Sequence, residues 1–299
     1  MARISRRAAL KTFAAAGAAA ACVPEAADAR VERKPSPEDH GLLVDAVRCV
    51  GCRACVTSCR EANGKAPDVQ VVNGAAYDAP IDLNAQTLTV IKRWEEGKDA
   101  GYVKAQCMHC VHPACVSVCM LGALHKGAGG VVEYDVAKCV GCRYCQVACP
   151  FNVPKFEWAK ALPRIVKCEL CRHRYAEGKG PACAEVCPRD AVTSGKRGEL
   201  LAEARRRIEA RPEAYQARIY GETDGGGTNV LYLSPVPFGA LGLPALGEEP
   251  APALSETIQH GIYQGFVAPI ALFGALSIVT WRNRRSAEHA PAAGEEESR

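Results

Sequence analysis

The chain has 299 residues and 17 cysteines, and sixteen of these cysteines fall into four groups of four. Groups one and three have gaps of two, two and three residues, whereas the gaps are two, four and three in group two and two, eleven and three in group four. The groups are Cys49, Cys52, Cys55 and Cys59 (one); Cys107, Cys110, Cys115 and Cys119 (two); Cys139, Cys142, Cys145 and Cys149 (three); and Cys168, Cys171, Cys183 and Cys187 (four). A chain of this length does not need disulfides to compensate for a small core, so the thiols have another role.

The spacing predicts 4Fe–4S clusters, because it is the spacing that holds such clusters in bacterial ferredoxins. Three closely spaced thiolates reach three irons of one cluster, and the fourth cysteine of the group faces away and binds the neighbouring cluster. Zinc and disulfides are the alternatives. Zinc sites usually separate their two Cys pairs by a dozen or more residues, and disulfides require an oxidising compartment. Since the four groups leave only Cys22 over, we expect four 4Fe–4S clusters.

Residues 1–29 are predicted to be a removable signal with cleavage after Ala29, because a charged start containing Arg6 and Arg7 precedes an apolar stretch at 12–23. The paired arginines resemble a twin-arginine signal, although Ala9 stands where that signal usually has Phe. A general secretory signal and a lipoprotein signal at Cys22 are the alternatives. Because clusters are inserted before export and only the twin-arginine route carries folded proteins, we favour that route and a periplasmic location.

Residues 258–281 contain no Asp, Glu, Lys or Arg, and this length is enough to cross a bilayer as a helix. Arg282, Arg284 and Arg285 follow directly, which predicts a single span with residues 282–299 in the cytoplasm. A buried amphipathic helix is the alternative. His260 lies in this stretch, and the sequence assigns it no quinone or haem role.

The remaining sequence favours short strands around the cysteine groups. We expect strands at 42–44, 69–72, 88–91 and 131–134 and a helix at 199–210. On that helix, Arg205, Arg206 and Arg207 are interpreted as a solvated face, with a docking patch as the alternative. Residues 201–254 are otherwise interpreted as an extended segment rich in Gly and Pro. A net charge of +4 without a clustered basic face does not indicate a nucleic-acid binder.

Two kinds of polar side chain lie close to the cysteines. His109 and His112 are the candidates for replacing a thiolate, as in a Rieske centre, but all four cysteines of group two are present. We therefore expect both histidines to donate hydrogen bonds or to lie on the surface. Positive charge beside a cluster raises its reduction potential, and the cations in or next to the groups are Arg53, Arg143, Lys138 and Lys167.

Residues from about 40 to 200 resemble the four-cluster ferredoxin subunits of respiratory molybdenum oxidoreductases, such as formate dehydrogenase and dimethyl sulfoxide reductase. The motifs that carry the resemblance are Lys-Ala-Gln-Cys-Met-His-Cys from Lys104, Cys-Pro-Phe-Asn-Val-Pro-Lys from Cys149 and Lys-Cys-Glu-Leu-Cys from Lys167. Together with the signal, Tyr220-Gly221-Glu222 and the C-terminal stretch, the whole chain most resembles HybA-type iron–sulfur subunits of membrane-bound nickel–iron hydrogenases. Met120 follows Cys119 where the family usually has Pro.

The resemblance implies a nested arrangement of the groups, whereas spacing alone leaves a sequential pairing of groups one and two equally open. The implied fold class is α+β, with two interleaved ferredoxin-like units and one C-terminal transmembrane helix. Residues 40–105 and 160–200 form one unit and residues 106–159 the other. The implied ligands are Cys49, Cys52, Cys55 and Cys187 for cluster 1; Cys59, Cys168, Cys171 and Cys183 for cluster 2; Cys107, Cys110, Cys115 and Cys149 for cluster 3; and Cys119, Cys139, Cys142 and Cys145 for cluster 4.

The function that the resemblance implies is electron relay without catalysis by the chain itself. The expected partners are the catalytic subunits of a periplasmic nickel–iron hydrogenase and a quinone-reactive subunit of the inner membrane. The equivalent subunit of a formate dehydrogenase, or of a reductase for sulfur compounds, is the alternative.

Overall fold

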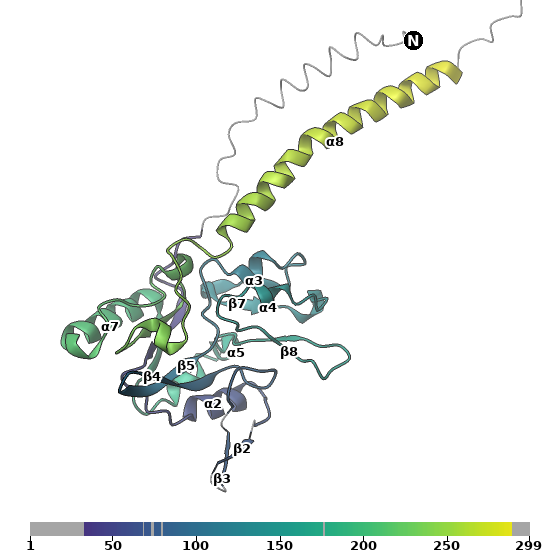
Figure 1. Cartoon of the computed structure of the whole chain (residues 1–299). Helices are drawn as coiled ribbons and strands as arrows, with labels where there is room; N and C mark the ends of the chain where they lie inside the picture. Colours follow the sequence, from purple (N-terminus) through teal and green to yellow (C-terminus); the bar gives the residue numbers. More distant parts are fainter. Residues whose placement is uncertain (1–32, 68, 73–74, 79, 176, 289–299) are drawn as a thin grey trace, which may run out of the picture. The chain divides into compact units, whose positions relative to one another are not determined.

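A three-stranded sheet joins the beginning of the cysteine-rich region to its end (Figure 1). The computed structural model describes residues 33–288, except 68, 73–74, 79 and 176. The central strand β1 (His40–Asp45) pairs antiparallel with β10 (Val192–Lys196) and parallel with β11 (Val230–Leu233). Strands from three distant parts of the chain thus complete one sheet, within a compact unit that spans Glu32–Ala253.

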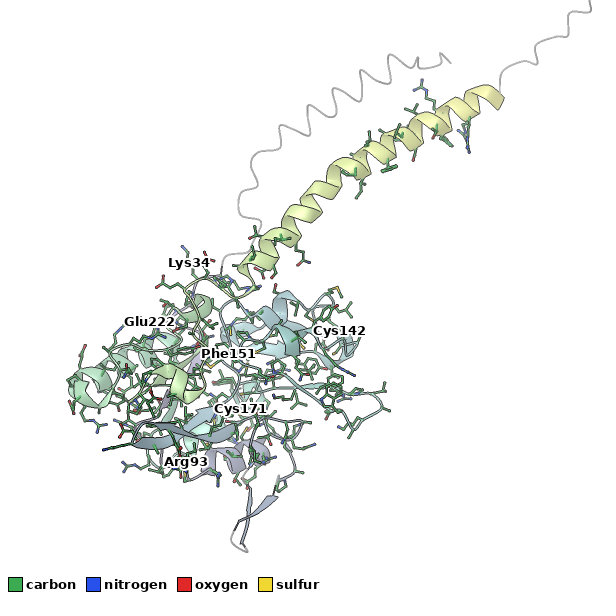
Figure 2. All side chains as sticks on the ribbon, viewed as in Figure 1. Lys34, Arg93, Cys142, Phe151, Cys171 and Glu222 are labelled. Carbon is green, nitrogen blue, oxygen red and sulfur yellow. The ribbon has the colours of Figure 1, made fainter. Side chains whose placement is uncertain are left out.

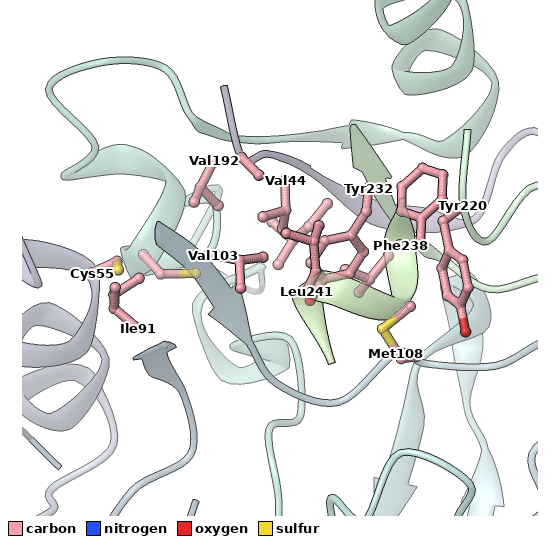
Figure 3. Packing of buried hydrophobic residues seen from close by; sticks show 14 of the residues in the cluster. Val44, Cys55, Ile91, Val103, Met108, Val192, Tyr220, Tyr232, Phe238 and Leu241 are labelled. Carbon is pink, nitrogen blue, oxygen red and sulfur yellow. The ribbon is translucent and has the colours of Figure 1, made fainter. Parts of the chain in front are cut away.

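Both faces of β1 are buried, since successive side chains of a strand point to opposite sides. Leu43 packs with Leu200 and Ala204 of helix α7 (Arg197–Ala210). Leu42 and Val44 pack on the other side in the main core, which also contains Val103, Tyr232 and Cys55 (Figure 3). The core therefore extends from the sheet to a cysteine of group one.

The other elements are short, and most of them flank cysteines. The paired hairpins are β2 (Val69–Val72) with β3 (Ala75–Asp78), β4 (Val90–Glu96) with β5 (Asp99–Ala105), β6 (Leu124–Lys126) with β7 (Val132–Tyr134), and β8 (Lys155–Phe156) with β9 (Ile165–Val166). The short α-helices are α2 (Ala54–Ala62), α3 (Ala114–Ser117), α4 (Tyr144–Ala148), α5 (Arg172–Tyr175) and α6 (Ala182–Glu185). Single 3₁₀ turns lie at Ala128–Gly130, Val136–Lys138, Pro212–Ala214, Asp224–Gly226 and Phe238–Leu241.

The expected strands at 42–44 and 69–72 and the expected helix at 199–210 are confirmed by β1, β2 and α7. Residues 201–254 differ from the expected extended segment. Beyond the expected helix, they contain the whole of β11, whose residues are all buried. The Gly and Pro content of this segment shapes its turns, while its short apolar run at 230–233 completes the central sheet.

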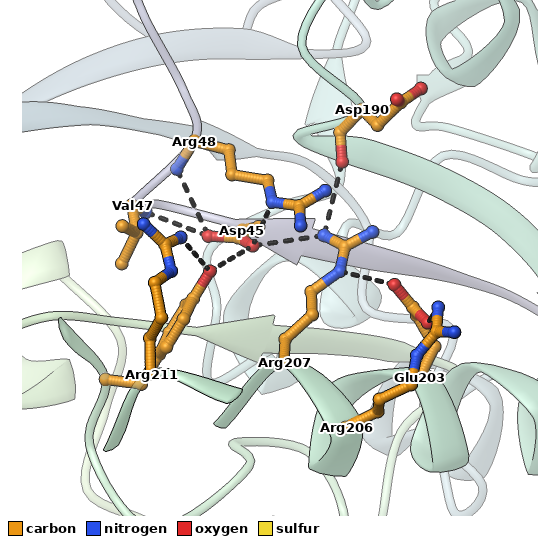
Figure 4. A network of polar contacts seen from close by, with 9 residues as sticks. Asp45, Val47, Arg48, Asp190, Glu203, Arg206, Arg207 and Arg211 are labelled. Atoms are coloured by element: carbon orange, nitrogen blue, oxygen red, sulfur yellow. Dashed lines mark hydrogen bonds and ion pairs between the residues drawn. The ribbon is translucent and has the colours of Figure 1, made fainter. Parts of the chain in front are cut away.

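A buried ionic network fixes the end of β1 to α7 (Figure 4). Asp45 is fully buried, and its Oδ2 lies 3.0 Å from a guanidinium nitrogen of Arg207 and 2.9 Å from the hydroxyl of Tyr215. Arg207 also donates to Glu203 at 2.7 Å and to the carbonyl of Asp190 at 3.2 Å. The interpretation of Arg207 as part of a solvated face is therefore wrong, because α7 lies on the sheet with this side chain directed at the carboxylate of Asp45.

The C-terminal helix α8 (Ala253–Glu288) includes the stretch that was expected to span a membrane. That expectation is wrong: in the part of the chain that the structure describes, no helix combines the length and the apolar character needed to cross a bilayer. The stretch has no charged residue, but Gln259, Gln264, Ser277 and Thr280 interrupt its apolar sequence.

Candidate iron–sulfur centres

All sixteen grouped cysteines are free thiols. Half of them are buried, namely Cys55, Cys59, Cys107, Cys115, Cys145, Cys168, Cys171 and Cys183. Only Cys52 and Cys142 are exposed, and they occupy the same position in groups one and three. Figure 2 shows Cys142 at the periphery of the molecule and Cys171 within it.

The four cysteine loops share one backbone feature. The residue before the second cysteine has a positive φ in every loop: 70° at Gly51, 47° at His109, 72° at Gly141 and 55° at Leu170. This left-handed conformation turns the chain so that closely spaced cysteines can face a common centre. At Gly51 a side chain is also excluded by space, because a Cβ atom would lie 2.6 Å from the ring of Tyr102.

The backbone turn that follows the fourth cysteine is the same in group three, where Pro150 comes next, and in group two, where Met120 does. The N–H of Asn152 donates to the carbonyl of Cys149 at 3.0 Å, and Asn152 has a φ of 51°. After Cys119, the N–H of Gly122 donates in the same way at 3.0 Å, with a φ of 63°. Met120 therefore does not change this turn, because Gly122 supplies the left-handed residue that closes it.

Backbone N–H groups are directed at several cysteine sulfurs. Leu124 N lies 3.4 Å from the Sγ of Cys119, and Leu170 N lies 3.3 Å from the Sγ of Cys168. Burial raises the pKa of the Cys149 thiol, and hydrogen bonds from three N–H groups of the turn that follows oppose this rise. Such donors favour the thiolate, the form that binds iron.

The structure brings group one beside group four and group two beside group three. Helix α2, which carries Cys55 and Cys59, packs against α6, which carries Cys183. Helix α3 of group two packs in the same way against α4 of group three. The thiol charge of Cys187 acts on Cys49, and the thiol charge of Cys149 acts on Cys115.

Burial makes these thiols weak acids when no metal is present. It raises the pKa of Cys55, Cys59 and Cys115 to about 12 and that of Cys145 to about 11, with neighbouring thiolates adding to the rise. Mutually repelling thiolates in an apolar core require a compensating positive charge. Iron supplies such a charge, so binding would release the thiol protons.

Lys104 supplies a further positive charge among the cysteines, one that the spacing of the cysteine groups does not indicate. Its side chain on β5 is 1% exposed. Burial tends to lower its pKa, but the thiolates of Cys183, Cys55, Cys168 and Cys59 raise it above its usual value. The family motif that begins at Lys104 was the available signal, although a lysine in a strand gives no indication of its burial.

Lys126 was also missed, whereas Lys167 was predicted. Lys126 donates to the carbonyl of Cys110 at 3.0 Å, and burial lowers its pKa to about 8. Lys167 is buried and donates to the carbonyls of Cys168, at 3.1 Å, and Val132.

The other three cations predicted from the sequence are more exposed to solvent than Lys167. Arg143 is exposed and stacks on Trp158, with 4.1 Å between the guanidinium carbon and the ring centroid. Lys138 pairs with Asp135 at 3.2 Å, and Arg53 is partly buried at the start of α2.

Both histidines of group two are buried, so the expectation that they might lie on the surface is wrong. The ring of His112 lies against the backbone of Arg33, with 3.1 Å between its Nε2 and the Arg33 nitrogen. The Nδ1 of His109 accepts the N–H of Val132 at 3.1 Å. Burial, followed by the charges of Lys167 and Lys126, holds the pKa of His109 well below its usual value.

The donor set fits 4Fe–4S clusters. It consists of free thiols, half of them buried, with backbone N–H groups directed toward several sulfurs and the buried charge of Lys104 acting on four of the thiols. Within the described residues, no three His, Cys, Asp or Glu side chains converge as they would around a single metal ion. The thiolates of a cluster bind different irons and surround it, so they need not converge in this way.

Comparison with known proteins supports this chemistry. Residues 99–197 match the model of a 4Fe–4S dicluster domain. The hydrogenase-2 operon protein HybA of Escherichia coli O157:H7 is 37% identical over 96% of this chain and 98% of its own length. The iron–sulfur subunit of nitrate-inducible formate dehydrogenase from Escherichia coli K12 is 37% identical over 64% of this chain and 66% of its own. That of formate dehydrogenase from Haemophilus influenzae is 35% identical over 67% of each chain.

The relation to the HybA protein extends over nearly the full length of both chains, whereas the formate dehydrogenase subunit of Escherichia coli K12 matches about two thirds of each. The four loops, their buried thiols and this match together show that the chain belongs to the HybA-type family of 4Fe–4S electron-transfer subunits.

Proposed function

We propose that the chain holds four 4Fe–4S clusters with the nested ligand sets that the resemblance implies. Cluster 1 is held by Cys49, Cys52, Cys55 and Cys187, and cluster 2 by Cys59, Cys168, Cys171 and Cys183. Cluster 3 is held by Cys107, Cys110, Cys115 and Cys149, and cluster 4 by Cys119, Cys139, Cys142 and Cys145. The packing of α2 on α6 and of α3 on α4 supports this assignment, as does the electrostatic influence of Cys142, Cys119 and Cys139 on Cys145.

The observation that best supports a relay is the order of the thiols. Cys55 of cluster 1 is within electrostatic range of Cys183 of cluster 2. Cys168 of cluster 2 stands in the same relation to Cys107 of cluster 3. Cys115 of cluster 3 and Cys145 of cluster 4 are related in the same way.

The accessibility of the thiols follows the same order. Among the sixteen grouped cysteines, which the structure describes, the two exposed ones, Cys52 and Cys142, belong to the terminal clusters 1 and 4. The proposed path therefore has two accessible ends and a shielded middle.

The relay connects a nickel–iron hydrogenase to a quinone-reactive membrane subunit, as the family resemblance of the sequence implies. The name of the HybA relative, a hydrogenase-2 operon protein, supports the hydrogenase part of this proposal. The similarity to formate dehydrogenase subunits supports a second candidate, in which the same relay serves a formate dehydrogenase. The chain itself contributes no catalysis in either case, because the clusters use every grouped thiol and leave none for a nickel site.

We further propose that the chain is exported in folded form by the twin-arginine route and acts at the periplasmic face of the inner membrane. The Arg6-Arg7 pair and the need to insert clusters before export support this route. The signal itself, residues 1–29, lies outside the described residues.

Anaerobically purified protein should contain about sixteen irons and sixteen acid-labile sulfides per chain, because four clusters each contain four of both.

Replacing Cys187 with Ser should alter the electron paramagnetic resonance signal of cluster 1 before that of cluster 2, which keeps all four thiolates. The matched variant Cys183→Ser should alter cluster 2 first. A content near eight irons, or the same cluster altered by both variants, would contradict the proposed ligand sets.

Deleting the subunit should stop hydrogen-dependent reduction of quinone but leave hydrogen-dependent reduction of an artificial dye largely intact, because the dye takes electrons directly from the catalytic subunits. Both rates are measured in membranes with the assembled catalytic subunits. If quinone reduction by hydrogen continues at the wild-type rate, the chain does not serve the hydrogenase. The same pair of assays with formate then tests the second candidate.

A further inference from the structure

Two buried side-chain nitrogens in the second cysteine loop lack a hydrogen-bond partner among the described residues. They are the Nε2 atoms of Gln106 and His109, which flank Cys107 and whose side chains are 3% and 0% exposed. A buried donor without an acceptor costs about 1–3 kcal/mol. Two such donors in one loop indicate an acceptor that the polypeptide does not supply.

The hydrogen bond at the other side of the His109 ring determines where its proton lies. Nδ1 accepts the N–H of Val132 at 3.1 Å, so Nδ1 is unprotonated. The ring proton is consequently on Nε2, which is therefore a donor. The ring is held at this position although its backbone φ of 47° is one that Gly adopts without strain, as Gly51 and Gly141 do at the equivalent positions.

The amide of Gln106 is oriented in a similar way. Its Oε1 accepts from the hydroxyl of Thr89 at 3.4 Å, which leaves the NH₂ group to face elsewhere. Gln106 lines a cavity of about 90 Å³ together with Phe151, Asn152 and Val153. These three residues also supply the N–H groups directed at the Cys149 sulfur, so the cavity that Gln106 lines borders the turn that follows this proposed ligand of cluster 3.

We propose that Gln106 and His109 donate N–H···S hydrogen bonds to cluster 3 and raise its reduction potential. A hydrogen-bond donor stabilises the more negative, reduced cluster more than the oxidised one. These are positioning residues of the relay and not iron ligands. The inference rests on the ligand set proposed above for cluster 3.

The test uses the full-length, cluster-loaded protein in two variants. His109→Asn keeps an oxygen that can accept the N–H of Val132 but removes the Nε2 donor, and Gln106→Met removes the amide. The reduction potential of cluster 3 is measured by redox titration followed by electron paramagnetic resonance. Each variant should lower the equilibrium constant for its one-electron reduction about tenfold, which corresponds to a potential lower by 59 mV. His173→Asn is the matched control, since that ring is exposed and its Nε2 lies 3.0 Å from the carbonyl oxygen of Ala62, and it should leave the potential of cluster 3 unchanged.

A measurement on the wild-type protein makes the test independent of variant folding. With ¹⁵N-labelled histidine, the cluster that Cys115→Ser alters should show a nitrogen coupling in electron–nuclear double resonance. If this cluster is present but shows no coupling, and its potential is unchanged in the variants that load iron, the inference is overturned while the relay stands. If Cys115→Ser alters no cluster, the proposed ligand set fails, and the inference fails with it.

Discussion

Replacing Lys104 with Met is expected to lower the reduction potentials of clusters 1 and 2 by about 90 mV, an effect on the order of thirtyfold in each reduction equilibrium. The lysine is buried among thiols of both clusters: Cys55 on one side, and Cys59, Cys168 and Cys183 on the other. At a separation of about 8 Å and an effective dielectric constant of about 20, a unit charge contributes about 2 kcal/mol. Reduction adds one negative charge to a cluster, so loss of this cation disfavours reduction by that amount.

Two variants separate charge from packing. Lys104→Arg keeps the charge and should retain most of the potential. Lys92→Met removes a lysine from the adjacent strand β4, where its side chain is 43% exposed and pairs with Asp82, and should shift no potential measurably. Redox titration of all three proteins provides the comparison. Unchanged potentials in a fully loaded Lys104→Met protein would show that the buried charge does not act on the clusters.

Replacing Arg207 with Met should lower the midpoint of thermal unfolding by about 10 °C, because it removes the buried cation 3.0 Å from the carboxylate of Asp45 and leaves the partly exposed Arg48, at 3.5 Å, as its ion-pair partner. Breaking one side of a buried ion pair costs about 3–5 kcal/mol, and each kcal/mol corresponds to about 2–4 °C for a chain of this size.

The same network contacts the carbonyl of Asp190, three residues after Cys187, while the carbonyl of Asp45 accepts the N–H of Cys49 at 3.2 Å. Cluster 1 should therefore be the first to be lost on heating.

Arg206→Met is the matched control, because this neighbouring side chain on α7 is 78% exposed and pairs only at the surface with Glu203. Such surface pairs contribute about 0–1 kcal/mol, so the midpoint should change by no more than about 2 °C. Equal effects of the two substitutions, measured by calorimetry on loaded protein, would show that the network around Asp45 does not stabilise the fold.

The sequence was most informative where chemistry depends on local spacing. The cysteine groups, the glycine conformations at Gly51 and Gly141, and helix α7 all follow from residues within a few positions of one another. The turn after Cys119 could also be found locally, because Gly122 replaces the effect of the missing proline.

Features that depend on distant contacts were not predictable in this way. The pair of Asp45 and Arg207 joins residues 162 positions apart, and Lys104 gains its role only when groups one and four meet around it. The C-terminal stretch shows another limit: a length of 24 residues without charge predicted a membrane span, but no helix in the described part of the chain is long and apolar enough to form one.

The pairing of β1 with β10 and β11 has a consequence for the order in which a newly made chain can mature. Groups two and three are adjacent in the sequence, so a nascent chain can bring them together early, at little cost in loop closure. With the proposed ligand sets, group one must wait for Cys187, and its supporting strand β1 gains its last neighbour only when β11 has been synthesised. Cofactor insertion would thus begin at clusters 3 and 4, at one end of the relay, and finish at cluster 1, so an incomplete chain would lack the cluster at the other end.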